Sequence, residues 1–178
     1  GHLSFYDNAA LADLGALARI ESAEGLYIDT SPITSLPTFA PGYQGIRYLS
    51  LSDLPELTDL DAMAGWPGLH NPSGFYEEMA IHIVGAPKLN SVAGLESALA
   101  DAVAASSPNT LLAAPSLELA DLPALTSLAG LEPLNLASLT LRHLPNITDL
   151  TPLANLTDAR DVVLAGLGAP PSLAGLDN

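Results

Sequence analysis

The apolar residues of this chain follow one pattern that returns seven times. In each copy they favour the first, third, sixth, ninth, twelfth and fifteenth positions, and proline is frequent at the seventh. The clearest copies are LELADLPALTSLAGL, from Leu117 to Leu131, and LTLRHLPNITDLTPL, from Leu139 to Leu153. The seven copies begin at Leu3, Leu26, Leu49, Ile81, Leu117, Leu139 and Val162. Four of the six steps are 22 or 23 residues and two are 32 and 36, and such a period is typical of a solenoid whose coils each contribute one strand.

Each copy opens with two apolar residues separated by one other residue, which is the alternation of a strand with one buried face. The predicted inward pairs are Leu3/Phe5, Leu26/Ile28, Leu49/Leu51, Ile81/Ile83, Leu117/Leu119, Leu139/Leu141 and Val162/Leu164. A strand of about five residues is not stable alone, so we expect successive copies to pair into a parallel sheet. The proline at the seventh position, as in Pro123, lacks an N–H and ends the strand. Beyond it, apolar residues recur at every third position, which favours 3-10 turns or short helices opposite the sheet.

A polar pair recurs inside the segment that returns from one strand to the next, as in Thr58-Asp59, Thr126-Ser127 and Thr148-Asp149. Two interpretations are possible. A column of threonine along a flat face is compatible with ice binding. Alternatively, Ser, Thr, Asp and Asn side chains cap short helical turns by accepting hydrogen bonds from backbone N–H groups. We favour capping, because these residue types bond to nearby backbone in most contexts.

The two long steps hold insertions of different character, at about residues 61–80 and 93–115. The first contains an aromatic group among Gly and Pro turn residues: Trp66, His70, Phe75 and Tyr76. Aromatic loops on rigid scaffolds are often binding elements, but Trp66 and Phe75 could equally turn inward to cover the step in the stack. The second insertion repeats apolar residues at every fourth position and predicts an amphipathic helix over residues 93–107.

The segments ALTSLAGLEPL, from Ala124 to Leu134, and KLNSVAGLESAL, from Lys88 to Leu99, resemble the second half of a leucine-rich repeat coil of the receptor L-domain type. The turn prolines fit the same pattern, and the stretch NITDLTPLANL, from Asn146 to Leu156, is similar to coils of bacterial internalins. The resemblance implies a right-handed β-solenoid with a binding role at the surface of a bacterial cell. It implies no particular ligand, because such repeats are scaffolds whose exposed positions vary with the partner.

The chain departs from that family at the position where an asparagine ladder is expected inside the turn. That position holds Asn8, Ser31, Leu54, Ala86, Leu122 and Leu144, so we expect an apolar turn interior in the later copies. We expect one repeat domain over residues 1–178, cut from a longer protein, because no polar cap covers either end and Gly1-His2 resembles the remnant of a tag. No signal peptide is present, which carries little weight in a fragment.

The composition of the chain restricts the classes of partner that it could bind. The net charge is −15, with five basic residues against 20 acidic ones, which disfavours nucleic acid and anionic membrane surfaces. No run of about 18 uncharged apolar residues predicts membrane insertion, although 48% of the residues are apolar. The acidity serves solubility, or alternatively attracts basic partners. With no cysteine, there is no disulfide framework, and the redox compartment stays open.

The side chains that alternate with the buried ones face a ligand on a solenoid sheet. We expect Tyr6, Tyr27 and Tyr48 to lie in register on successive coils, and tyrosine is enriched at recognition surfaces, although strand propensity alone also favours it. The predicted ligand-binding residues are Tyr6, Tyr27, Asp29, Tyr48, Trp66, His70, Tyr76 and His82.

No sequence signature of an enzyme is present: there is no Gly-rich phosphate loop, no GxSxG elbow and no cysteine. Asp53, Asp59 and Asp61 could approach Asp29 around a calcium ion, but they lack the spacing of a calcium loop, so we expect no metal and no cofactor. The expected function is non-enzymatic recognition of a protein or glycan partner, outside the cytoplasm or at the cell surface. The alternatives are a structural spacer, surface-layer or adhesin stalk, and, from another class, a hydrolase or metal-dependent enzyme.

Overall fold

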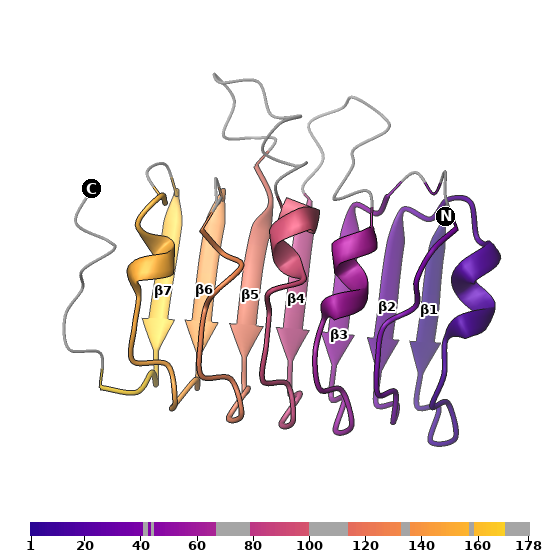
Figure 1. Cartoon of the computed structure of the whole chain (residues 1–178), viewed down its shortest axis with the longest axis horizontal. Coiled ribbons are helices and arrows are strands. Elements are labelled where there is room, and N and C mark those ends of the chain that lie inside the picture. Colours follow the sequence, from indigo (N-terminus) through magenta and orange to yellow (C-terminus); the bar gives the residue numbers. More distant parts are fainter. Residues whose placement is uncertain are drawn as a thin grey trace.

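The computed structural model describes residues 1–40, 43, 45–66, 79–99, 114–132, 136–156 and 159–169. Within these residues the chain forms one open sheet of seven parallel strands, arranged in the order of the sequence. The strands are β1 (His2–Tyr6), β2 (Gly25–Asp29), β3 (Tyr48–Ser52), β4 (Ala80–Val84), β5 (Ser116–Ala120), β6 (Ser138–Arg142) and β7 (Asp161–Ala165). After each strand the chain returns along one side of the sheet and enters the next strand beside the last (Figure 1). The predicted parallel sheet of stacked repeats is thereby confirmed.

The register of the sheet places the predicted inward pairs in two continuous columns. Leu49 aligns with Ile81 and then Leu117, and Leu51 aligns with Ile83 and then Leu119. From β2 to β6 both columns are buried. At β7 the inward-column residue Val162 is 43% exposed, because β7 has a strand neighbour on one side only within the described residues. Burial of one strand face against the return segments forms the core of the fold.

The residue that follows each strand has a left-handed backbone, with φ between 47° and 70°. These residues are Asp7, Thr30, Asp53, Gly85, Asp121, His143 and Gly166. The N–H groups of the first six extend the sheet ladder by one step: that of Asp121 donates to the Arg142 carbonyl at 3.1 Å, and that of His143 donates to the Ala165 carbonyl at 2.8 Å. This conformation redirects the chain, and after β2 to β6 the next residue is buried, at Ser31, Leu54, Ala86, Leu122 and Leu144.

The next position is the one where the asparagine ladder was expected. It is buried and apolar in four successive repeats, at Leu54, Ala86, Leu122 and Leu144. The interior of these turns is therefore apolar, as predicted. The proline that follows occupies the second position of a β-turn, and the turn after β5 closes with a hydrogen bond from the Leu125 N–H to the Leu122 carbonyl at 3.2 Å.

The return segments contain the predicted short helical turns. Three are 3-10 helices, η1 (Gly15–Arg19), η2 (Asp61–Gly65) and η4 (Thr151–Leu153). Residues 95–99 are helical, with Leu95 and Leu99 fully buried. The remainder of the helix predicted over residues 93–107 lies outside the described residues.

The polar column of the return segments caps these turns. In five repeats a side-chain oxygen accepts a hydrogen bond from the backbone N–H two residues later, and the acceptors are Asp13, Asp59, Ser91, Ser127 and Asp149. At Asp149, hydrogen bonds from the backbone N–H and then the hydroxyl of Thr151 hold the pKa of the carboxyl below its usual value. Asp59, Ser127 and Asp149 of the Thr-Asp and Thr-Ser pairs thus accept hydrogen bonds from nearby backbone N–H groups, as the capping interpretation predicts. The N-cap residues Leu14, Leu60 and Leu150 themselves make no side-chain cap.

Candidate functional site

The face of the sheet turned away from the return segments carries the first, third and fifth residue of every strand. Its central column consists of Ser4, Tyr27, Ser50, His82, Glu118, Thr140 and Val163. None of these side chains is buried, whereas the residues on either side of them in β2 to β6 are. This outward face is therefore the accessible surface on which most of the predicted site residues lie.

The three tyrosines do not lie in register, so that prediction was wrong. Tyr6 pairs with Asp29, Tyr27 pairs with Ser4 and Ser50, and Tyr48 pairs with Gly25. The tyrosines recur every 21 residues, whereas the strands recur every 23, so each tyrosine falls two residues earlier in its strand than the last. A shift of two residues keeps the same face of a strand. Tyr6, Tyr27 and Tyr48 therefore form a diagonal across the outward face of β1 to β3, which we call the tyrosine strip.

The members of the tyrosine strip influence one another. Partial burial raises the pKa of the Tyr27 phenol, the neighbouring Tyr48 and Tyr6 phenols raise it further, and Arg47 lowers it. The Arg47 guanidinium lies 5.2 Å from the centre of the Tyr48 ring, within the range of a cation–π contact. Tyr6 is 56% exposed, and Tyr27 and Tyr48 are half-buried. The strip thus combines stacking surface, phenol hydroxyls and one cationic group.

Trp66 does not belong to this surface, which corrects its assignment as a ligand-binding residue. It is 5% exposed, and its indole Nε1–H donates a hydrogen bond of 2.9 Å to the Pro37 carbonyl. Its ring packs against Phe39 at 5.0 Å between ring centres, and Phe39 stacks on Tyr43 at 3.9 Å. The side chain covers the core where η2 ends, the inward alternative considered for it. His70 and Tyr76 lie outside the described residues.

Asp29 and His82 occupy different parts of the outward face. Asp29 aligns with Tyr6 at one end of the tyrosine strip, and its carboxylate accepts a hydrogen bond of 2.8 Å from the Thr30 hydroxyl. His82 lies two strands from Tyr27, and its Nδ1 is 3.0 Å from a carboxylate oxygen of Glu118 on the neighbouring strand. The structure therefore brings together Tyr6, Tyr27, Asp29 and Tyr48, while His82 forms a separate pair.

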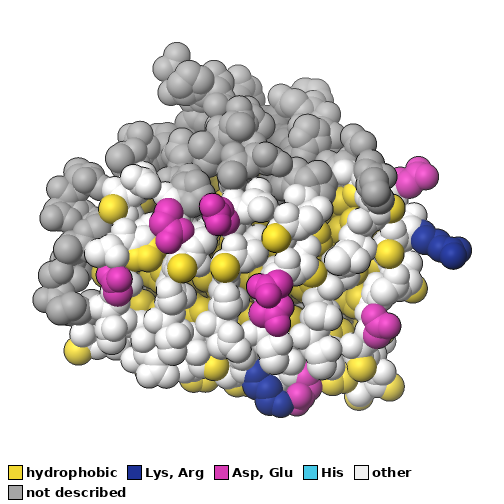
Figure 2. Space-filling model, in the orientation of Figure 1, with side chains coloured by type: hydrophobic (Ala, Val, Ile, Leu, Met, Phe, Trp, Pro, Cys, Tyr) yellow, Lys and Arg dark blue, Asp and Glu magenta, His cyan; other side chains and the backbone are white. Residues whose placement is uncertain are grey.

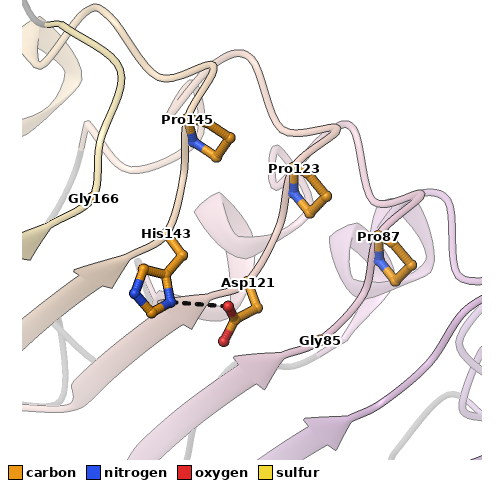
Figure 3. A pocket seen from close by; sticks show the side chains of 7 residues that line it. All are labelled: Gly85, Pro87, Asp121, Pro123, His143, Pro145 and Gly166. Carbon is orange, nitrogen blue, oxygen red and sulfur yellow. Dashed lines mark hydrogen bonds and ion pairs between the residues drawn. The ribbon is translucent and has the colours of Figure 1, made fainter.

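A second surface, at the carboxyl ends of β4 to β7, was not foreseen from the sequence. It is a groove of about 540 Å³ lined by Gly85, Pro87, Asp121, Pro123, His143, Pro145 and Gly166. The prolines stand in a row on successive turns, and the His143 and Asp121 side chains meet nearer the strand ends (Figure 3). Each of these residues alone has a structural explanation, as turn former or strand terminator. The sequence feature that could have predicted the groove was the recurrence of these residues at exposed positions in consecutive copies.

Clusters of titratable side chains on these surfaces are small. Among the described residues, no three His, Asp or Glu side chains gather where they could hold a metal ion. His82–Glu118 and His143–Asp121 are isolated pairs. None of the helices described is long and apolar enough to cross a membrane.

Comparison of the chain with protein-family models, with curated proteins and with solved structures yields no significant match. Its class is therefore defined by the fold itself, a stack of strand-and-return repeats that exposes one face of a parallel sheet.

Proposed function

We propose that the chain is a leucine-rich repeat module of the receptor L-domain type, a right-handed solenoid that binds a protein or glycan partner at the cell surface without catalysing a reaction. The steps of 22 or 23 residues, the turn prolines and the Ser-Leu-Ala-Gly-Leu return segment support the repeat type. The strands pair in sequence order, as such a solenoid requires.

The tyrosine strip is the observation that carries the binding proposal. Tyr6, Tyr27 and Tyr48 come from three strands yet lie on one face, beside Asp29 and with Arg47 over the Tyr48 ring. Tyrosine offers a large, rigid and amphipathic contact whose ordering costs little side-chain entropy. The surface suits a partner that presents sugar rings or flat side chains with hydrogen-bonding groups.

Charge sets a second condition on the partner. The chain carries a net charge of −15, and acidic side chains are spread over the face of the return segments (Figure 2). That face lies opposite the tyrosine strip, so the net charge of the whole chain is what would attract a basic partner, and this attraction falls as salt is added. We therefore expect association with a basic partner to be fastest at low ionic strength.

A comparative screen tests the proposal. The wild-type chain and the double variant Tyr27→Ser/Tyr48→Ser are applied in parallel to arrays of glycans and of extracellular proteins. Serine already occupies the column of Tyr27 at Ser4 and Ser50, so the sheet accommodates the change. Thr140→Ser, in the same column on β6, is the matched control.

We expect ligands that bind the wild type and the control but not the double variant. Ligands retained equally by all three proteins would place recognition elsewhere. A stalk or spacer would capture no ligand with any of them, and that result would also contradict the proposal.

A further inference from the structure

The groove at the carboxyl ends of β4 to β7 has two unlike walls. One wall is the row Pro87, Pro123 and Pro145, whose rings are exposed and lie on three successive turns (Figure 3). The other wall is the pair of His143 and Asp121, whose side chains are 67% and 55% exposed. An apolar shelf thus faces a polar edge along the direction of stacking (Figure 3).

The groove is preformed by its turns. Each groove proline follows a buried residue whose carbonyl accepts a hydrogen bond from the residue three positions later, at 3.1 Å after β4, 3.2 Å after β5 and 3.1 Å after β6. The proline ring fixes φ, so the apolar shelf loses little conformational entropy when it is covered. Most lining residues are exposed, so a ligand is covered from one side. That shape suits part of a partner surface better than an enclosed small molecule.

A partner segment cannot bind in this groove by pairing its backbone with these turns as an added strand. The N–H groups of Gly85, Asp121 and His143 already donate to the carbonyls of the next repeat, at 3.1, 3.1 and 2.8 Å. A peptide that added itself as a strand would need such groups free. These N–H groups are therefore not available to a peptide added as a strand, and the side chains of the groove remain as contacts.

The polar edge favours a cation. His143 Nδ1 lies 2.9 Å from Asp121 Oδ1, and a carboxylate has about four acceptor positions, so Asp121 retains capacity for a second donor. Among the described residues, Asp121 is the one carboxylate of the groove lining. The neighbouring Lys88 is paired with Glu56 at 2.6 Å. Arg142 ends β6 on the outward face and is not part of the lining.

We propose that this groove is a second binding site, for a segment of a partner protein that lays an aromatic side chain on the proline rings and pairs an adjacent lysine or arginine with Asp121. The proline row supplies the apolar contact, and Asp121 supplies charge complementarity within a chain of net charge −15. The site is separate from the tyrosine strip on β1 to β3 and does not rest on it.

Three capped synthetic peptides test the proposal: Lys-Trp-Lys, Glu-Trp-Glu and Lys-Ala-Lys. Each is titrated into the isotope-labelled chain while amide chemical shifts are followed. We expect Lys-Trp-Lys to shift the amides of Gly85, Asp121, His143 and Gly166, with a dissociation constant of about 1 mM. Glu-Trp-Glu, which lacks the cations, and Lys-Ala-Lys, which lacks the aromatic ring, should each bind about fivefold more weakly, which is the effect of losing one exposed contact.

Matched variants locate the effect. Asp121→Asn and Pro123→Ala should each weaken Lys-Trp-Lys about three- to fivefold. Asp7→Asn and Pro55→Ala change the same residue types at equivalent positions in repeats outside the groove, and they should leave binding unchanged. Asparagine tolerates the left-handed backbone of both aspartates, so the fold is kept.

Several results would overturn the proposal. These are the absence of shifts with Lys-Trp-Lys at concentrations of about 5 mM, equal binding of Glu-Trp-Glu, or equal weakening by the two control variants. Shifts confined to Tyr27 and Tyr48 would overturn it as well, while leaving the tyrosine strip intact as a site.

Discussion

Gly94 packs directly against the main-chain carbonyl of Leu60, one repeat earlier, so closely that a Cβ at residue 94 would overlap the Leu60 oxygen. The next repeat makes the equivalent contact, where a Cβ on Gly130 would lie 2.7 Å from the Ala93 Cα. The Ala-Gly-Leu triplet at residues 93–95 and 129–131 therefore has a physical reason. The return segments of these repeats are in close backbone contact, and only glycine fits at residues 94 and 130.

Replacement of this glycine tests the stacking. Gly94→Ala should lower the free energy of unfolding by about 2 kcal/mol or more, because backbone must move to admit the methyl group. Gly65→Ala is the control, since a Cβ there meets nothing within 4 Å. We expect the control to change stability by less than about 0.5 kcal/mol in urea denaturation. Equal effects of the two substitutions would show that the return segments are not packed as described.

The inward columns of the sheet can be probed separately. Leu119→Ala removes a fully buried side chain between Ile83 and Leu141 and should cost about 2–5 kcal/mol through the cavity it leaves. Its neighbour Glu118 points to the outward face, so Glu118→Ala should cost less than about 1 kcal/mol. Urea denaturation distinguishes the two. A larger loss for Glu118→Ala would reverse the assigned faces.

The core was predictable from the sequence because two periods agree. Alternation within each strand fixes which face is buried, and the steps between copies fix the register, so Leu49, Ile81 and Leu117 fall in one column. The predicted register of the three tyrosines was wrong because they recur every 21 residues, whereas the strands that carry them recur every 23. Where the two spacings differ, burial of the leucines sets the register of the strands. The exposed tyrosines then take whatever positions that register gives them.

The rest of the candidate site depended on contacts that no local pattern encodes. Trp66 is buried because a carbonyl 29 residues earlier accepts its indole N–H. The groove joins Gly85, Asp121 and His143, which become neighbours only when three repeats stack. Stacking was predicted from the period, and the turn prolines were aligned across the copies, but the aligned residues were interpreted one by one as turn formers and not as one exposed surface.

Tyr43 gives the fold a dependence on alkaline pH. Its hydroxyl is buried and has no hydrogen-bond partner among the described residues, and burial raises its pKa to about 12. Because this folded value exceeds the ordinary value of 10.0, the unfolded chain loses its proton first, and stability falls as the pH rises from 10.0 toward 12. Tyr43→Phe should remove that part of the loss in denaturation measured across this range.

The same variant makes a second test at neutral pH. Phenylalanine removes a buried hydroxyl without a partner, so stability should stay equal or rise by about 1 kcal/mol. A clear destabilisation by Tyr43→Phe would mean that the hydroxyl has a partner and that the alkaline loss has another source.

Thr30 holds a left-handed backbone, with φ of 47°, although it is β-branched. Asparagine adopts this conformation more readily, so Thr30→Asn should raise stability by about 0.5–1 kcal/mol. The same substitution at Thr140, inside β6, should lower stability because asparagine is a poor strand former. Thermal denaturation of the two variants gives the comparison, and a loss in both would show that Thr30 is not strained.

The most direct measurement is the dissociation constant of a captured partner for the wild type, for Tyr27→Ser and for Thr140→Ser, determined by calorimetry. Tyr27 lies at the centre of the tyrosine strip, and both variants leave the same small hydroxyl side chain in one column of the outward face. We expect Tyr27→Ser to weaken binding about tenfold or more, as truncated aromatic anchors do, and Thr140→Ser to bind like the wild type. Unchanged binding by Tyr27→Ser would contradict recognition through the tyrosine strip.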